Sequence, residues 1–242
     1  MSWVHDFFDL RYADIALSQA PDEAMIDGLM ARLALSPGDR ALDQCCGVGR
    51  LSIPLARRGV AVVGVDVIPA YVARAEARAE GLPARFVAAD AAAFVPDAPV
   101  DAALCWWTSF GYAPDDAGNR ALLARAFEAL RPGGLYAVET HNVPSLLRQP
   151  TPRFEQVLGG VRVVRDSELD LRRGLFAQRW TFHPPEGDSW TRYGTTRLYM
   201  PHRIAEMMAE VGFEDVAVMA DLSGAPLRLE HPRVLVLGRR PA

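Results

Sequence analysis

Short apolar segments alternate with segments of helical length over the first 143 residues of this 242-residue chain. Glycine or proline separates most of them, as expected at the ends of strands and helices. Such alternation predicts right-handed βαβ units whose strands lie parallel in one sheet. The predicted strands are residues 40–44, 61–65, 84–88, 101–105 and 135–140, and the predicted helices are residues 21–35, 49–58, 69–80 and 119–130.

A different pattern follows a proline-rich break at Pro144–Pro152. Apolar and polar residues alternate, with turn residues between the runs, which is typical of antiparallel strands. The predicted antiparallel strands are 157–165, 167–172, 175–182 and 191–199, followed by a helix at 201–211 and strands at 213–219 and 233–237. We therefore predict one α/β domain with a helical cap (1–35), a core (36–143), an antiparallel β insert (150–200) and a C-terminal helix with the last strands (201–242).

Charge and cysteine usage narrow the partners and the environment of the chain. The formal net charge is −4 and the basic residues are scattered, which disfavours binding to nucleic acid phosphates. No uncharged apolar run approaches the roughly 20 residues that span a bilayer. Cys45, Cys46 and Cys105 lack the spacing of disulfides or zinc ligands. We therefore expect a cytoplasmic protein with reduced thiols, no metal site, and no nucleic acid or membrane partner.

The segment Asp43–Gly49 joins a predicted strand to a predicted helix through small residues. In an open parallel sheet, ligands bind beyond the carboxyl ends of the strands. Gly47 and Gly49 would let a ligand approach backbone amides without an intervening Cβ. A tight turn without a ligand explains this segment alone equally well, so the decision depends on other residues.

Two carboxylates at the ends of the next two strands favour a ligand. Asp66 ends the second strand, where an acid can accept both hydroxyls of a ribose. Asp90 ends the third strand, where it can accept from an adenine amino group while the Ala91 amide donates to a ring nitrogen. Either aspartate alone also suits a helix N-cap. Together with Asp43, however, they place acids at the ends of three successive strands above one crevice.

The charge of Asp43 distinguishes between two ligands of this kind. A nicotinamide dinucleotide is the nearest alternative, but its fingerprint has a third glycine where this chain has Ser52. An acid before the glycine turn would also repel a diphosphate, whereas it would attract the cationic amino group of S-adenosylmethionine. We therefore predict S-adenosylmethionine as cofactor and S-adenosylhomocysteine as its product, with a nicotinamide oxidoreductase as the weaker alternative.

These motifs resemble those of the class I S-adenosylmethionine-dependent methyltransferases over about residues 36–143. The acid-x-Gly-x-Gly-x-Gly loop of that family corresponds to Asp43–Gly49, with Cys45 in place of the first glycine, and Leu130–Gly134 corresponds to the turn before the fifth strand. We expect Cys45 to avoid a positive φ. The resemblance implies a Rossmann-like, doubly wound, mostly parallel α/β sheet with an antiparallel last strand and a small antiparallel insert after the fifth strand.

The resemblance also implies the residues that hold the cofactor. Tyr12 would close over its methionine end. The full set implied is Tyr12, Asp43, Cys45, Gly47, Gly49, Asp66, Val67, Asp90, Ala91, Cys105 and Trp106.

Two further segments, Phe7–Tyr12 and Asp101–Tyr112, resemble bacterial sugar and natural-product N-methyltransferases. That resemblance implies a small-molecule substrate, methylated on nitrogen or oxygen. It also implies that the insert covers the substrate or forms a homodimer. The transferred methyl should point toward Trp106 and Trp107, of which we expect at least one to pack under the sheet.

Few residues are candidates for chemistry on the substrate. A sulfonium methyl is already electrophilic, so the main task is to align the nucleophile, and a base is needed only if the nucleophile is protonated. His141 follows the fifth strand and is the best-placed imidazole for a general base, while Tyr112 can position the substrate. Simple packing roles are open for both. A cofactor-binding protein that transfers no methyl group is the alternative from a different functional class.

Overall fold

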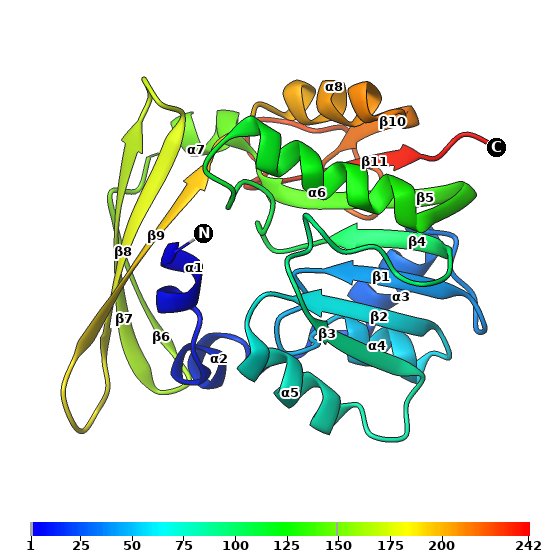
Figure 1. The fold of residues 1–242 in the computed structure, drawn as a ribbon. Coiled ribbons are helices and arrows are strands. Elements are labelled where there is room, and N and C mark those ends of the chain that lie inside the picture. The colour runs from blue at the N-terminus through cyan, green and yellow to red at the C-terminus, as the bar shows by residue number, and fades with distance from the viewer. Residues whose placement is uncertain (1, 149) are drawn as a thin grey trace.

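The structure is a computed structural model that describes residues 2–148 and 150–242. Met1, in the predicted cap, and Gln149, in the predicted proline-rich break, lie outside the described residues. Two sheets dominate the fold, and the N-terminal helices lie between them (Figure 1).

The larger sheet has seven strands in the order β10-β11-β5-β4-β1-β2-β3. The pairs β1–β2, β2–β3, β1–β4 and β4–β5 are parallel, and β11 is antiparallel to both of its neighbours. The predicted fold class, a mostly parallel sheet with an antiparallel last strand, is therefore confirmed. The strands are β1 (Arg40–Gln44), β2 (Ala61–Asp66), β3 (Ala84–Ala88), β4 (Val100–Cys105), β5 (Leu130–His141), β10 (Glu214–Met219) and β11 (Arg233–Arg239).

Helices cover both faces of this sheet, which explains why its central strands are apolar on both sides. Leu29 and Leu55, from two helices on one face, share a buried cluster with Leu104 of β4. Leu123 and Met207, on the other face, pack in a cluster with Tyr136 of β5. The helices are α3 (Glu23–Arg32) and α4 (Ser52–Arg57) on the first face, α6 (Asp116–Ala129) and α8 (Pro201–Val211) on the second, and α5 (Pro69–Arg78) against β3.

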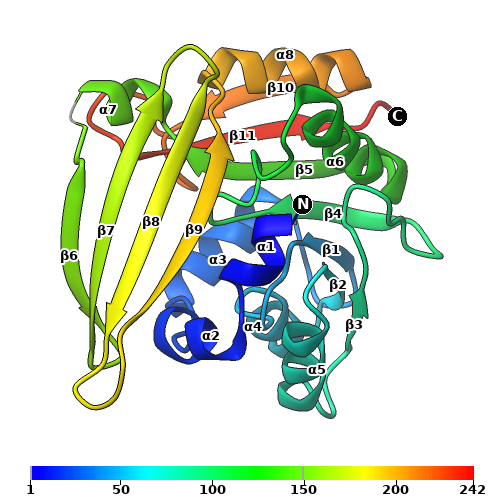
Figure 2. The same cartoon turned by 60° about the vertical axis from the view of Figure 1, so that its left-hand side comes forward.

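The insert forms a separate antiparallel sheet in the order β6-β7-β8-β9. It faces the carboxyl ends of the parallel strands, with α1 and α2 in between (Figures 1 and 2). Trp3 and Phe7 of α1 pack on Gly194 of β9, where a Cβ would come within 3.0 Å of the Trp3 ring. The elements are α1 (Ser2–Phe7), α2 (Leu10–Ala16), β6 (Arg153–Leu158), β7 (Val161–Asp170), β8 (Leu175–His183) and β9 (Trp190–Arg197).

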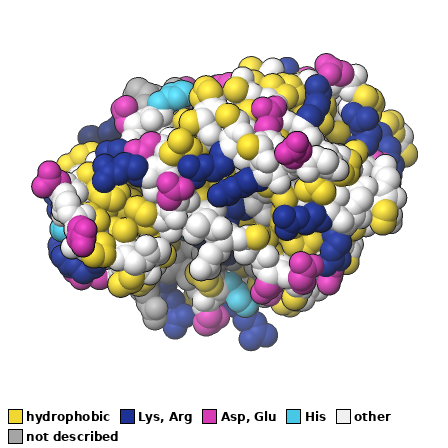
Figure 3. All heavy atoms as spheres, turned by 90° about the horizontal axis from the view of Figure 1, so that it is seen from below, with side chains coloured by type: hydrophobic (Ala, Val, Ile, Leu, Met, Phe, Trp, Pro, Cys, Tyr) yellow, Lys and Arg dark blue, Asp and Glu magenta, His cyan; other side chains and the backbone are white. Residues whose placement is uncertain are grey.

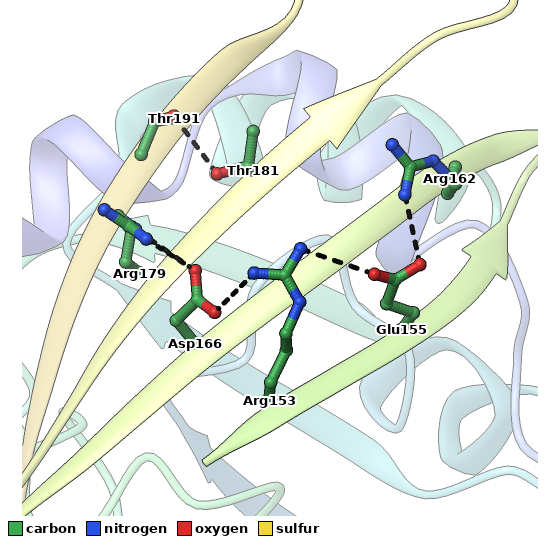
Figure 4. Close-up of polar contacts among 7 residues, drawn as sticks. All are labelled: Arg153, Glu155, Arg162, Asp166, Arg179, Thr181 and Thr191. Atoms are coloured by element: carbon green, nitrogen blue, oxygen red, sulfur yellow. Dashed lines mark hydrogen bonds and ion pairs between the residues drawn. The ribbon is translucent and has the colours of Figure 1, made fainter.

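Strand alternation gives the insert one inner and one outer face. On the outer face, Asp166 of β7 accepts from both Arg153 and Arg179, at 3.1 and 2.7 Å, and Glu155 accepts from Arg162 at 3.0 Å (Figure 4). Acidic and basic side chains are likewise interspersed among apolar ones on the face of the molecule in Figure 3. The outer charges of the insert are thus mutually compensated.

Three local predictions were wrong. The proline-rich break contains a helix, α7 (Val143–Arg148), because Pro144 lies in its first turn, where no backbone donor is needed. Residues 131–134 belong to β5 as a bulged start, with Gly133 at φ +77°, and do not form a separate turn. The bounds of the first two insert strands were wrong, since the turn at Gly159–Gly160 divides the predicted strand 157–165 and β7 runs through residue 166 without a break.

Candidate active site

A cavity of about 350 Å³ lies between the carboxyl ends of the parallel strands, the N-terminal helices and the inner face of the insert. Most of the predicted site residues line it. They are Tyr12, Cys45, Gly47, Asp66, Val67, Asp90, Ala91, Trp106, Tyr112 and His141. Asp43, Gly49 and Cys105 are not among the lining residues.

The glycine turn is fixed by the acid at the end of β2. One carboxylate oxygen of Asp66 accepts from the Gly47 amide at 2.8 Å, and the other accepts from the Ile68 amide at 2.9 Å. The side chain is largely buried, and this desolvation raises its pKa. Asp66 therefore orders the loop and also presents a carboxylate to the cavity.

Cys45 adopts a left-handed backbone conformation, with φ +59°, so the expectation that it avoids a positive φ was wrong. The reason is the chain direction: the next residue, Cys46, donates to the carbonyl of Val65 at 3.0 Å, which makes the loop turn sharply after β1. The Cys45 thiol lies against Cys105, and the hydrogen bond between them, together with burial, raises the pKa of Cys45. Residue 45 thus adopts a backbone conformation that glycine favours, although it carries the small side chain of cysteine.

Asp43 lies beneath the loop and does not face the cavity. It is 3% exposed and accepts from the Ser52 hydroxyl at 2.5 Å. Burial raises its pKa to about 7, and the neighbouring carboxylate of Asp66 adds to the effect. In the sequence analysis, Ser52 counted only as the residue that replaces the third glycine of the dinucleotide fingerprint. In the structure it is the direct hydrogen-bond partner of Asp43.

Asp90 lines the opposite end of the cavity, after β3. Its side chain is exposed and accepts from the Ala92 amide at 2.9 Å. Asp90 thus makes the local backbone contact expected of a capping aspartate while its carboxylate stays accessible from the cavity.

The loop after β4 carries two aromatic side chains and a strained backbone. Trp106 is 6% exposed and packs in the apolar cluster under the sheet, as expected for at least one of the two tryptophans. Trp107 and Thr108 both have positive φ, at +52° and +65°. Glu139 of β5 stabilises this shape, since its carboxylate accepts from the Trp107 amide at 2.9 Å. The Arg50 guanidinium lies 3.9 Å from the centre of the Trp107 ring.

Tyr12 and Tyr112 belong to an aromatic group over the cavity. Tyr112 stacks on Phe8 and meets the Trp3 ring edge-on. Burial raises the pKa of Tyr12 to about 12 and raises that of Tyr112, so both phenols stay neutral at physiological pH. Their placement allows them to close over a bound ligand.

His141, at the end of β5, is the imidazole that reaches the cavity. Burial, together with the nearby guanidiniums of Arg233 and Arg165, lowers its pKa to about 4. The ring meets Phe176 of the insert edge-on, at 5.7 Å between centroids. His141 is therefore neutral near pH 7 and able to accept a proton or a hydrogen bond.

Sequence reasoning missed five side chains that line the cavity from the insert and from β11: Arg165, Gln178, Trp180, Thr196 and Arg233. A period of two was the available signal, because Val161, Val163 and Arg165 share one face of β7.

Comparisons with known proteins agree with this architecture. Residues 41–134 match the family described as a methyltransferase domain. An S-adenosyl-L-methionine-dependent Diels-Alderase of Talaromyces variabilis is 34% identical over 148 residues, which are 57% of this chain and 49% of that protein. The chain spans about half or less of the length of the curated relatives that it matches.

Two solved structures share the fold over nearly the whole chain. The CcbJ methyltransferase of Streptomyces caelestis has a TM-score of 0.80 at 19% identity, covering 99% of this chain and 95% of that one. CalS10, an amino pentose methyltransferase of Micromonospora echinaspora, has a TM-score of 0.69 at 21% identity, covering 97% and 98%.

These findings agree with the assignment made from the motifs: residues 41–134 match a methyltransferase domain, and the chain has the fold of solved methyltransferase structures. Residues 41–134, which match the family, include the glycine turn and the acids at the ends of β2 and β3. The predicted enzyme class and its cofactor are thereby confirmed at the level of the family.

Proposed function

We propose that the chain transfers the methyl group of S-adenosylmethionine to a nitrogen or oxygen of a small molecule. One observation supports this most directly: a single cavity runs from Asp66 and Asp90, at the ends of β2 and β3, to His141 under the insert. Cofactor and acceptor can therefore meet in one cavity, where the insert and the N-terminal helices shield them from water. In-line methyl transfer requires such an arrangement.

The cavity walls suggest a division of labour. Asp66 would accept from the ribose hydroxyls, Asp90 and Ala91 would bind the adenine, and Tyr12 would cover the methionine end. His141 would act on the acceptor as a neutral base, and Tyr112 would position it. The cavity, which cofactor and acceptor would share beneath the insert, favours a small acceptor.

The name of the Talaromyces relative favours one second candidate, a cofactor-dependent reaction without methyl transfer. Incubation with methyl-labelled S-adenosylmethionine and pools of small amines and alcohols distinguishes the two. Label in an acceptor with equal formation of S-adenosylhomocysteine supports our proposal. Cofactor binding with no label transferred from any pool supports the alternative.

The role of Asp66 has its own test, which needs no acceptor. We expect Asp66→Asn, which keeps an acceptor oxygen for the loop but removes the charge, to weaken S-adenosylmethionine binding about tenfold or more, because charge-assisted hydrogen bonds are lost. Calorimetry measures this, with Asp97→Asn as a control on an exposed aspartate. Equal affinities of the Asp66 variant and the wild type would contradict the role.

No helix among the described residues is long and apolar enough to cross a membrane. We propose a cytoplasmic location, which the three free thiols support.

A further inference from the structure

Arg165 and Arg233 bring two guanidiniums to the insert end of the cavity. Arg165 projects from the inner face of β7, where Trp180 of β8 is its direct cross-strand partner. Arg233 begins β11 and pairs in register with His141 of β5. Strands β5, β7 and β11, which are distant in sequence, therefore place His141, Arg165 and Arg233 around the same cavity.

Several donors of this group have no acceptor among the described residues. Arg165 Nε, Arg233 Nη1 and Trp180 Nε1 are all buried without a hydrogen-bond partner. Only one contact to a carboxylate exists, from Arg233 Nε to Glu139 at 3.5 Å. Buried donors without acceptors are costly and uncommon, so a cluster of three calls for an explanation.

The outer face of the same sheet provides an internal comparison. There, Arg153, Arg162 and Arg179 each bond to Glu155 or Asp166 (Figure 4). Arg165 lies on the same strand as Arg162 but lines the cavity, and its side chain forms no hydrogen bond or ion pair with any described residue. Within the insert, the arginines of the outer face thus have carboxylate partners, whereas Arg165, which lines the cavity, has none among the described residues.

Local charge favours a monoanion as the missing partner. Arg165 and Arg233 contribute two positive charges and Glu139 one negative charge, while His141 between them is neutral. Burial, and after it the proximity of Arg233, also lowers the pKa of Arg165, as expected for a buried charge beside a like charge. A guanidinium presents a planar fork that matches a carboxylate in two parallel hydrogen bonds.

We propose that the methyl acceptor carries a carboxylate and that Arg165 and Arg233 bind it, with the Trp180 indole as an additional donor. This assignment rests on the proposed function, because it places the acceptor in the same cavity as the cofactor. It makes the two arginines determinants of substrate specificity in the part of the cavity that the insert and β11 line.

Benzoate and its neutral isostere benzamide test the proposal without knowledge of the acceptor. We expect benzoate to shift the imidazole resonance of His141 saturably in NMR titrations of the full chain, and benzamide to leave it unchanged. Equal effects of the two compounds, or no saturable effect of benzoate, would overturn the proposal. Tighter binding of inorganic phosphate than of benzoate would also overturn the carboxylate assignment, in favour of a phosphate group.

A matched pair of variants locates the site. Arg165→Met should weaken benzoate binding about tenfold or more, whereas Arg162→Met, on the outer face of the same strand, should leave it unchanged. Arg165 lies over the Phe154 and Trp180 rings but has no hydrogen-bond partner or counterion among the described residues, so Arg165→Met, which keeps an apolar contact with these rings, should change the melting temperature little. Loss of stability together with unchanged benzoate affinity would show a structural role and reject our assignment.

Calorimetry with S-adenosylmethionine on the same samples separates this proposal from the proposed function. Intact cofactor binding with no benzoate site rejects only the carboxylate assignment. Absent cofactor binding with a working benzoate site rejects the methyltransferase function and leaves the anion site standing.

Discussion

Asp43 and Asp66 end neighbouring strands, yet the fold gives them different tasks. Asp43 bonds to Ser52 beneath the glycine turn, while Asp66 bonds to the turn itself and reaches the cavity. From the sequence alone, we predicted that the Asp43 carboxylate attracts the cationic amino group of the cofactor. In the structure, any such effect has to act through the loop, because the carboxylate is buried.

The raised pKa of Asp43 predicts a pH-dependent contribution to stability. Its folded-state pKa of about 7 lies above the ordinary value of 3.8, so the folded state binds the extra proton in between. The free energy of unfolding should therefore fall as pH rises from about 4 to 7, by up to about 1.4 kcal/mol per pH unit for this group.

Asp43→Asn isolates this term, since an amide does not titrate. We expect the wild type to lose stability relative to Asp43→Asn as pH rises from 5 to 8 in urea unfolding. Asp97→Asn, at an exposed position, should show no such trend. A difference between wild type and Asp43→Asn that is independent of pH would contradict the buried protonated state.

His141 is predicted to serve the transfer step and not the cofactor. With its pKa lowered to about 4, it is deprotonated across the physiological range, so its ring nitrogen is free to accept a proton or a hydrogen bond from the methyl acceptor. His141→Ala should lower turnover in the labelled-methyl assay by about 100-fold, the ordinary scale of general base catalysis, with cofactor affinity unchanged.

His202→Ala, on the exposed side of α8, is the control for that experiment. An unimpaired His141→Ala enzyme would remove the imidazole from the mechanism and leave it a packing role against Phe176.

Gly111 connects the loop after β4 to the insert. Its carbonyl accepts from the Arg197 amide at 2.7 Å, and its own amide donates to Asn119 at 3.0 Å. With φ +106°, a Cβ there would lie 2.5 Å from the Arg197 carbonyl oxygen. The loop after β4 and strand β9 are therefore in direct contact through their backbones, with no space for a side chain at residue 111.

We expect Gly111→Ala to cost about 2 kcal/mol more stability than Gly81→Ala in thermal or urea unfolding. Gly81 is a matched control, because its φ is also positive, at +78°, but no atom lies within 4 Å of the added Cβ. Equal losses for the two variants would show that backbone strain alone matters and that the contact with β9 is loose.

For the whole molecule, a homodimer formed through the insert stays a prediction. The ion pairs on the outer face of the insert are already satisfied within the chain (Figure 4), so that face needs no partner for charge compensation. Light scattering after size exclusion should give twice the chain mass of 26.5 kDa. A mass equal to that of one chain would contradict the dimer and leave the insert only the role of covering the substrate.

Much of the fold was predictable from the sequence, because parallel strands buried on both faces are apolar and are bounded by glycine, proline and aspartate. The acids after β2 and β3 were found for the same reason: a strand end is a local feature. Helix α7 and the bulged start of β5 were missed, since proline and glycine mark a turn in isolation but are tolerated in a first helical turn or a bulge.

The sequence by itself determined the class of the domain, through the order of its elements and the spacing of its glycines and acids. Only the tertiary structure decided that Asp43 is buried, that Cys45 takes a left-handed conformation and that Arg165 and Arg233 converge on His141. The physical reason is distance along the chain. The burial of a side chain, its local charge and its hydrogen-bond partners depend on residues far away in sequence. The packing of the two sheets brings β5, β7 and β11 together around the cavity.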